Sequence, residues 1–125
     1  MIIGIDFDET ITRCPEFFAL LTKALMAEGH TVLIITFRPD PIVEIANKLE
    51  GLGIAFTELI TKSTPFSAAE FIEWKARICK ERKVDILFED MPDVAAAVEP
   101  PTVVMVPLDE RVRRLMASIP WSEEE

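Results

Sequence analysis

Two acidic clusters follow short apolar runs in this chain. Asp6 and Asp8 follow residues 2–5, and Glu89 with Asp90 follows residues 86–88. Short apolar runs of this kind are typical of buried strands, and in an open parallel sheet ligands bind at the carboxyl ends of the strands. The two clusters are therefore predicted to converge at one site.

Carboxylates gathered at one edge of a sheet repel each other unless a cation holds them together. A hard divalent cation with oxygen ligands is the usual solution, and Mg²⁺ keeps coordination positions open for phosphate oxygens. The pattern therefore predicts a magnesium site suited to phosphoryl chemistry.

Thr36 and Arg38 follow the second apolar run, residues 32–35. Both are predicted to lie at the same edge of the sheet. The hydroxyl of Thr36 is a candidate donor to a phosphate oxygen, although threonine is also a common strand residue. Arg38 has two interpretations, an anion-binding residue of the site or an ordinary surface arginine in a loop.

Lys75 lies in the apolar stripe of a predicted helix, four residues after Phe71 and three before Ile78. A lysine that points inward needs an anionic partner, and either the carboxylates or a bound phosphate would supply one. The alternative is a lysine whose stem follows the helix surface while its charge reaches solvent.

Strand-like and helix-like segments alternate along the chain. Strands are predicted over residues 2–7, 31–36, 55–60, 84–88 and 102–106. This order indicates a three-layer α/β/α Rossmann-like fold with a five-stranded parallel sheet.

The helix boundaries are marked by proline, glycine and capping residues. One helix is expected from Pro15 to Gly29, a second capped by Asp40 up to Gly51, and a third from the Ser67 and Glu70 capping box to about Arg82. A short helix over 92–98 and a last helix stopped by Pro120 complete the set. The last helix has an apolar stripe formed by Leu108, Val112, Leu115, Met116 and Ile119.

Length and composition limit the classes of protein. The 125 residues indicate one domain over 1–125, and 50% hydrophobic with 28% charged residues is ordinary for a globular protein. A net charge of −9 makes a nucleic-acid partner unlikely but does not exclude it, because Arg111, Arg113 and Arg114 form one tight basic cluster. Two isolated cysteines and the lack of a run of ~20 apolar residues predict a cytoplasmic protein without a membrane partner.

Four segments in order resemble the motifs of the haloacid dehalogenase-like (HAD) hydrolase superfamily. They are DFDET (residues 6–10), Thr36, Lys75 and FEDMPD (residues 88–93). Position 9 departs from the pattern, since most members have glycine where this chain has Glu9. The resemblance implies a HAD-like hydrolase, a magnesium-dependent phosphatase that hydrolyses a phosphomonoester through an aspartyl-phosphate.

The resemblance also implies a role for each matching residue. Asp6 would be the nucleophile and Asp8 the acid and base, with Thr36 and Lys75 as the other catalytic residues. The implied ligands of Mg²⁺ are Asp6, the main-chain carbonyl of Asp8, and Asp90. Glu89 and Asp93 are candidates for residues that hold these ligands in position. The implied substrate-binding residues are Thr10, Thr36, Arg38 and Lys75.

Too few residues separate the strands for a cap domain, so the resemblance implies an open site for a phosphorylated substrate. A neighbouring subunit in a homo-oligomer would then close it. Three alternatives remain: a catalytically silent phosphate- or partner-binding member, a polynucleotide 3′-phosphatase-like activity, and a receiver-like signalling domain. The receiver is disfavoured because its acidic, threonine and lysine positions would follow other strands.

Overall fold

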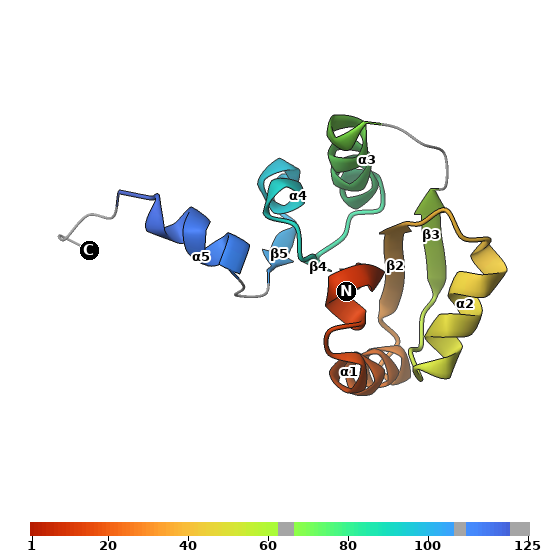
Figure 1. Cartoon of the computed structure of the whole chain (residues 1–125). Helices are drawn as coiled ribbons and strands as arrows, with labels where there is room; N and C mark the ends of the chain where they lie inside the picture. Colours follow the sequence, from red (N-terminus) through yellow and green to blue (C-terminus); the bar gives the residue numbers. More distant parts are fainter. Residues whose placement is uncertain (63–66, 107–109, 121–125) are drawn as a thin grey trace.

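The central element of the chain is an all-parallel, five-stranded sheet with the strand order β3-β2-β1-β4-β5 (Figure 1). The structure is a computed structural model that describes residues 1–62, 67–106 and 110–120. The strands are β1 (Ile2–Ile5), β2 (Thr31–Phe37), β3 (Glu58–Lys62), β4 (Ile86–Phe88) and β5 (Val103–Met105). The predicted α/β Rossmann-like fold with five parallel strands is therefore confirmed.

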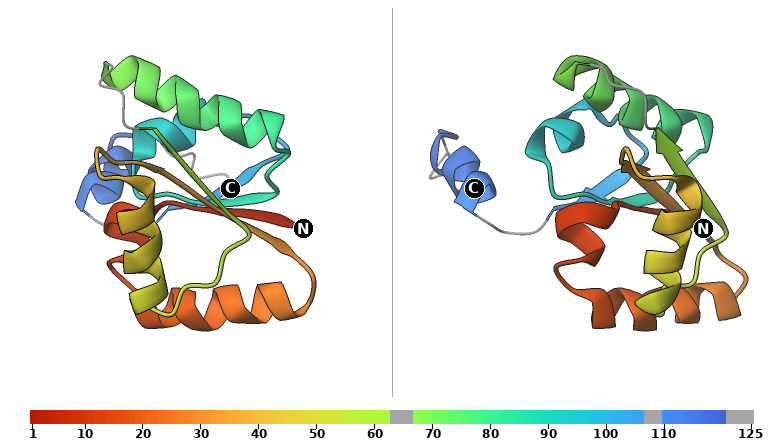
Figure 2. Two further views of the ribbon diagram at one scale, coloured as in Figure 1. Left: turned by 90° about the vertical axis from the view of Figure 1, so that its right-hand side faces the viewer. Right: turned by 45° about the vertical axis from the view of Figure 1, so that its right-hand side comes forward.

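Helices flank the sheet on both faces, as Figures 1 and 2 show. α1 and α2 lie on one face, and α3 and α4 lie on the other. Their bounds are α1 (Pro15–Ala27), α2 (Ile42–Gly51), α3 (Ala68–Glu81) and α4 (Pro92–Ala97). The sheet is thus covered on both faces, as its apolar strands require.

Neighbouring residues of β2 point into opposite cores. Ile34 packs in the core under α1 and α2, together with Ile45 and Leu49. Ile35 packs in the core under α3 and α4, together with Leu87. An uninterrupted apolar run is what a strand buried on both faces needs, which explains why these runs were visible in the sequence.

The structure corrects several predicted boundaries. β1 ends at Ile5 instead of residue 7, because a wide turn, η1 (Phe7–Ile11), carries the chain off the sheet. β3 begins at Glu58 instead of residue 55. The prediction that Asp40 caps α2 is wrong, because Pro41 precedes the helix and the Asp40 carboxylate accepts a hydrogen bond from Arg38 instead. Ser67 caps α3 as predicted, since its hydroxyl accepts from the N–H of Glu70.

The last described helix, α5 (Glu110–Ala117), lies apart from the sheet in Figure 1 and in the right-hand view of Figure 2. Leu108 of the predicted stripe, the loop at 63–66 and the tail at 121–125 lie outside the described residues. Among the residues that the structure describes, every helix falls short of the length and hydrophobicity needed to cross a bilayer.

Candidate metal centre

Three buried carboxylates meet at the carboxyl ends of β1 and β4. These strands are paired with Ile5 opposite Phe88, and the N–H of Asp6 donates to the carbonyl of Phe88 at 3.0 Å. Asp6, Glu89 and Asp90 each place a carboxylate oxygen within 4.8 Å of the other two. The predicted convergence of the two acidic clusters is confirmed for these three residues.

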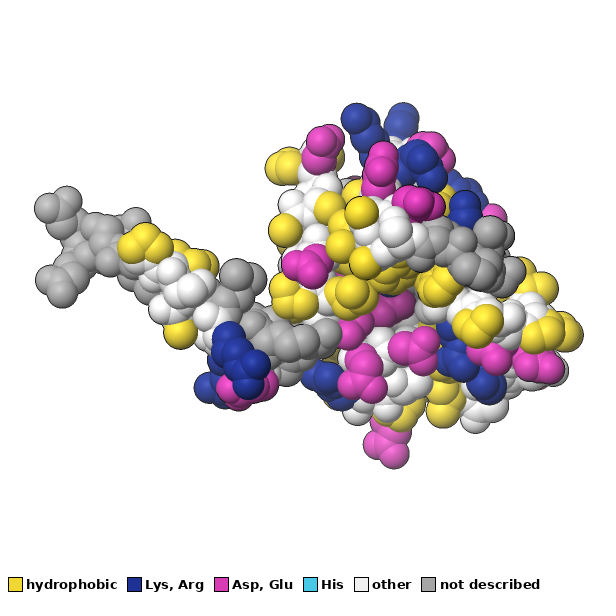
Figure 3. Space-filling model, turned by 45° about the horizontal axis from the view of Figure 1, so that its top comes forward, with side chains coloured by type: hydrophobic (Ala, Val, Ile, Leu, Met, Phe, Trp, Pro, Cys, Tyr) yellow, Lys and Arg dark blue, Asp and Glu magenta, His cyan; other side chains and the backbone are white. Residues whose placement is uncertain are grey.

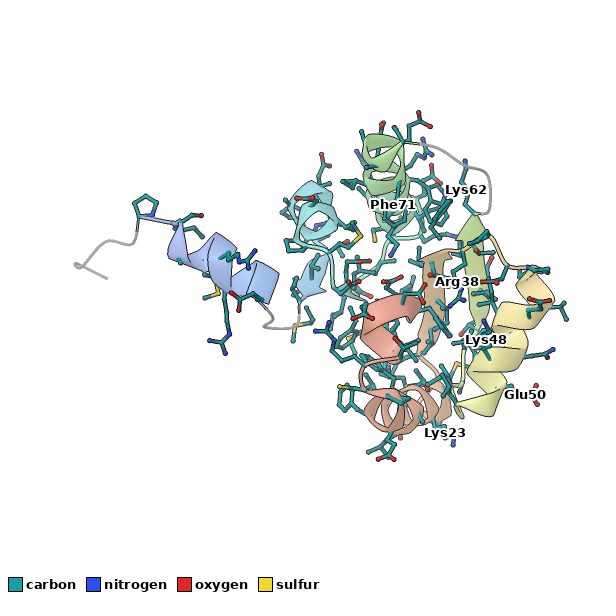
Figure 4. All side chains as sticks on the ribbon, viewed as in Figure 1. Lys23, Arg38, Lys48, Glu50, Lys62 and Phe71 are labelled. Atoms are coloured by element: carbon teal, nitrogen blue, oxygen red, sulfur yellow. The ribbon has the colours of Figure 1, made fainter. Side chains whose placement is uncertain are left out.

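Lys75 reaches this cluster from α3, the helix that covers one face of the sheet together with α4. Its Nζ lies 2.8 Å from Asp6 Oδ1 and 2.6 Å from Glu89 Oε2, and its side chain is 1% exposed. The prediction of an inward lysine with carboxylate partners is therefore confirmed, and the solvent-directed alternative is excluded. Phe71, labelled in Figure 4, packs one helical turn earlier, with its ring centroid 5.3 Å from Nζ.

Burial and the crowding of charges shift the pKa values in the cluster. Burial raises the pKa of Asp6 to about 8, against the opposing effect of Lys75. Burial also raises the pKa of Glu89. For Lys75, burial lowers the pKa, but the charges of Asp6 and Glu89 outweigh it and raise the pKa overall. Asp6 thus resists ionisation while the positive charge of Lys75 is stabilised.

The charges of the cluster do not balance when its groups are ionised. Asp6, Glu89 and Asp90 supply three negative charges, and Lys75 supplies one positive charge. A net charge of −2 in a buried site is costly unless protons or a cation neutralise it. A divalent cation has the charge that would balance the site.

Carboxylate oxygens are also the right donors for such an ion. Across an octahedral Mg²⁺ site, opposite ligand oxygens lie about 4.2 Å apart, twice the usual Mg–O distance of about 2.1 Å. The oxygens of the cluster, within 4.8 Å of one another, are close to this spacing. The residues present therefore fit the predicted cation.

Asp8 does not join the three carboxylates. Its side chain is 54% exposed and accepts a hydrogen bond from Arg38 Nη1 at 2.9 Å. Asp8 belongs to η1, in which Glu9 adopts a positive φ of 59° that favours glycine. The side chain of Asp8 is thus placed by the turn on the solvent side of the site.

Arg38 is not the ordinary surface arginine of the alternative interpretation. Its Nε donates to Asp40 Oδ2 at 2.7 Å, and its guanidinium lies 5.0 Å from the centroid of the Phe7 ring. The pairing with Arg38 lowers the pKa of Asp40. The sequence analysis missed the role of Asp40 as a partner that holds Arg38 at the site. The sequence signal for this pair was that Asp40 lies only two residues after Arg38.

The remaining predicted residues divide between the interior and the surface. Thr36 and Thr10 are buried, and within the described part of the chain Thr10 Oγ1 makes no hydrogen bond. Asp93 is exposed in the first turn of α4, which agrees with the alternative that it interacts with the helix dipole.

In Figure 3, acidic side chains gather near the middle of the face shown, and most basic side chains lie toward its rim and on α5.

Comparison with known proteins identifies no family. No family model matches the chain, and no curated protein sequence does. An uncharacterised protein from Corynebacterium glutamicum ATCC 13032 Kitasato is similar in structure, with a TM-score of 0.55 at 12% identity over 93% of this chain and 90% of that chain. A universal stress protein from Archaeoglobus fulgidus has a TM-score of 0.49 at 13% identity over 83% of this chain and 92% of that chain.

These findings contradict the prediction of a HAD-like phosphatase. The similar structures named above are an uncharacterised protein and a universal stress protein, and at such low identity the likeness extends to the fold alone. The predictions of HAD family membership and of phosphatase activity are therefore wrong. The roles of Asp6 as nucleophile and Asp8 as acid and base were implied by that resemblance alone and are not tested by the comparisons. Acidic residues at the carboxyl edge follow from the topology of a parallel sheet, which unrelated proteins share, so they do not identify a family.

Proposed function

We propose that the protein binds Mg²⁺ at the buried carboxylate cluster and, through the bound cation, a phosphorylated ligand. The observation that carries this proposal is that three buried carboxylates, of Asp6, Glu89 and Asp90, share one site with Lys75, so that full ionisation leaves an excess of two negative charges. A divalent cation balances that excess, and its remaining coordination positions would accept phosphate oxygens.

The contacts of each carboxylate suggest different roles. Glu89 is held at both oxygens, by Lys75 on Oε2 and by the N–H of Met91 on Oε1 at 3.3 Å. We therefore assign the cation to Asp6 and Asp90, with Glu89 positioning Lys75. Asp8 would contribute through its main-chain carbonyl, because its side chain is paired with Arg38.

The same charges explain why the ligand would depend on the cation. Arg38 is paired with two carboxylates, Asp8 and Asp40, so the rim of the site is negative as well. An anion approaching the metal-free site would be repelled from both directions. With the cation bound, Arg38 could release one carboxylate and bind a phosphate oxygen instead. Thr10 in η1 and Thr36 in β2 place their buried hydroxyls in the elements next to Arg38.

Isothermal titration of MgCl₂ into metal-free protein tests the cation site. We expect one ion per chain, binding about tenfold or more weakly in Asp90→Asn, because a ligand charge is lost, and unchanged binding in the exposed control Asp93→Asn. Glu89→Gln should weaken binding by about 10–100-fold through the lost positioning of Lys75. A wild type without saturable binding, or an Asp90→Asn variant that binds as tightly, would show that the cluster is only a buried ion-pair network.

The phosphorylated ligand is tested separately, with inorganic phosphate as the probe. We expect phosphate to bind in the presence of MgCl₂ but not in EDTA, and to bind more weakly in Arg38→Gln. Phosphate binding of equal strength in EDTA would contradict the dependence on the cation. Magnesium binding without any phosphate binding would support the proposed cation site and contradict the proposed phosphorylated ligand.

We also propose a cytoplasmic location. Cys14 and Cys79 are both free, and Cys14 is exposed. Exposed free thiols are usual where the surroundings are reducing.

A further inference from the structure

One part of the sheet carries apolar side chains that remain exposed. The register of β4 and β5 places Ile86 opposite Val103 and Phe88 opposite Met105. Ile86 and Phe88 pack toward the core under α1 and α2, so all four residues share that face. Val103 and Met105 are nevertheless 55% and 51% exposed. We call this surface the β4–β5 face.

A groove continues the β4–β5 face toward α1. It is lined by Thr10, Cys14, Phe17, Phe88, Met105 and Val106. Phe17 is exposed on α1, although its ring contacts that of Phe18 with the centroids 5.0 Å apart. Phe18 of α1 contacts Phe88 of β4, with the ring centroids 5.4 Å apart, but Figures 1 and 2 show no described helix over β5 on this face. The groove and the face together expose three large apolar side chains, those of Phe17, Val103 and Met105, and contiguous apolar surface of this kind is typical of an interaction site.

α5 has the complementary properties. Val112, Leu115, Met116 and Ile119 recur at helical spacing in the sequence, and both Met116 and Ile119 are exposed. Residues 110–117 carry three arginines and one glutamate, for a charge of +2. Residues 1–109 carry ten basic and 18 acidic residues, for a charge of −8, and three glutamates at 123–125 account for the rest of the net charge of −9. The helix is therefore both apolar on one side and opposite in charge to the body of the protein.

We propose that α5 of one copy packs on the β4–β5 face of a second copy, and that the exchange is reciprocal. In the structure α5 lies apart from the face of its own chain, so a single copy presents both an apolar helix and an apolar surface (Figure 1). Two copies related by a two-fold axis satisfy both at once, which is the geometry of a domain-swapped dimer. Opposite charge on the helix and the body favours the encounter.

The proposed dimer also bears on the metal centre. The groove includes Glu9 and Thr10 of η1, the turn that carries Asp8. The second copy's α5 would therefore lie against η1, next to the candidate metal centre. The dimer does not depend on the cation, so its test and the magnesium titration can fail independently.

Light scattering coupled to size-exclusion chromatography tests the proposal on the full chain. At a concentration of about 50 μM we expect wild type to have twice the chain mass of 14.1 kDa. Val103→Lys on the face and Met116→Lys on α5 should each give the monomer mass. Val43→Lys on α2 is the matched control, because Val43 is an exposed valine outside the face, 62% exposed against 55% for Val103. This variant should leave the dimer intact.

Mixing the two variants distinguishes exchange between copies from other arrangements. The Val103→Lys chain keeps its helix and the Met116→Lys chain keeps its face, so an equimolar mixture should recover a dimer with one of the two contacts. A monomeric wild type would overturn the proposal in favour of α5 packing on its own chain. A dimer that survives Met116→Lys would overturn it in favour of contact through the sheet alone. Circular dichroism melting checks that each variant is folded.

Discussion

Lys75 holds the carboxylate cluster together, because its positive charge lies between Asp6 and Glu89. Without it the three buried carboxylates would lose the positive charge that Asp6 and Glu89 contact. Its amphipathic stem explains how α3 tolerates it, since the methylene groups continue the apolar stripe that Phe71 and Ile78 begin. The residue therefore joins the packing of α3 to the charge balance of the site.

We expect Lys75→Met to destabilise the metal-free protein by about 3–5 kcal/mol, the usual cost of breaking a buried ion pair by removing one partner. Urea unfolding in EDTA measures this, and MgCl₂ should restore part of the loss. The control is Lys80→Met, which removes an exposed lysine whose pair with Glu99 at 3.7 Å contributes little. Equal stabilities of the two variants would contradict the role assigned to Lys75.

The stability of the metal-free protein should depend on the protonation of Asp6. Its pKa rises from 3.8 to about 8 on folding, so the folded state binds more protons than the unfolded state between these values. Stability should therefore fall as the pH increases from about 4 to about 8. Asp6→Asn should have a flatter profile in EDTA than wild type, measured by urea unfolding at several pH values. A variant profile as steep as that of wild type would show that Asp6 does not titrate in this range.

The two cysteines should differ in reactivity. Burial raises the pKa of Cys79 to about 11, and its thiol is inaccessible, whereas Cys14 is exposed. Because the thiolate is the reactive form, iodoacetamide should label one cysteine per native chain and both in urea. Mass spectrometry identifies the labelled peptide, and Cys14→Ser should abolish the native labelling. Labelling of native Cys14→Ser would mean that Cys79 is accessible.

At the scale of the elements, the central strand β1 is packed tightly on the side of α3. A Cβ placed on Gly4 would lie 3.1 Å from Leu87 Cδ1 and 3.2 Å from Ile35 Cδ1. Both neighbours belong to adjacent strands of the sheet. The absence of a side chain at Gly4 thus allows β1, β2 and β4 to share one dense core.

We expect Gly4→Ala to destabilise the protein by about 1–3 kcal/mol through overpacking. Gly51→Ala at the end of α2 is the matched control, because nothing lies within 4 Å of the added methyl group. That control should be neutral or stabilising by up to about 1 kcal/mol, since alanine favours a helix over glycine. Urea midpoints that shift equally for both variants would contradict this account of β1.

At the scale of the whole molecule, cation binding should appear as global stability. The candidate metal centre joins η1, β1 and β4 to α3, so unfolding of any of these elements would disperse the three carboxylates and Lys75. An ion that binds only the folded state adds about 2.7 kcal/mol at a concentration one hundred times its dissociation constant. We expect this increase for wild type in MgCl₂ by thermal unfolding, and at most about half of it for Asp90→Asn, because that variant binds the ion about tenfold or more weakly. KCl at matched ionic strength is the control, and an equal effect of KCl would indicate screening of the −9 charge instead.

The sequence by itself determined the class of fold and part of the site. Apolar runs and helical spacing are set by which residues must be buried, so the five parallel strands and the inward Lys75 were predictable from the chain. The convergence of Asp6 with Glu89 and Asp90 followed, because parallel strands end at the same edge. The match to four HAD motifs rested on the same topological regularity, which is why it did not identify the family.

Only the tertiary structure decided which groups pair within the site and which face remains open. Asp8 is two residues from Asp6, yet η1 turns it toward Arg38, and that turn depends on a left-handed Glu9 that no local pattern predicts. Likewise α5 is amphipathic in the sequence, but its position apart from β4 and β5 is a matter of tertiary packing. The physical reason is that burial is encoded in local periodicity, whereas partners distant in the sequence are selected by the three-dimensional arrangement of the elements that carry them.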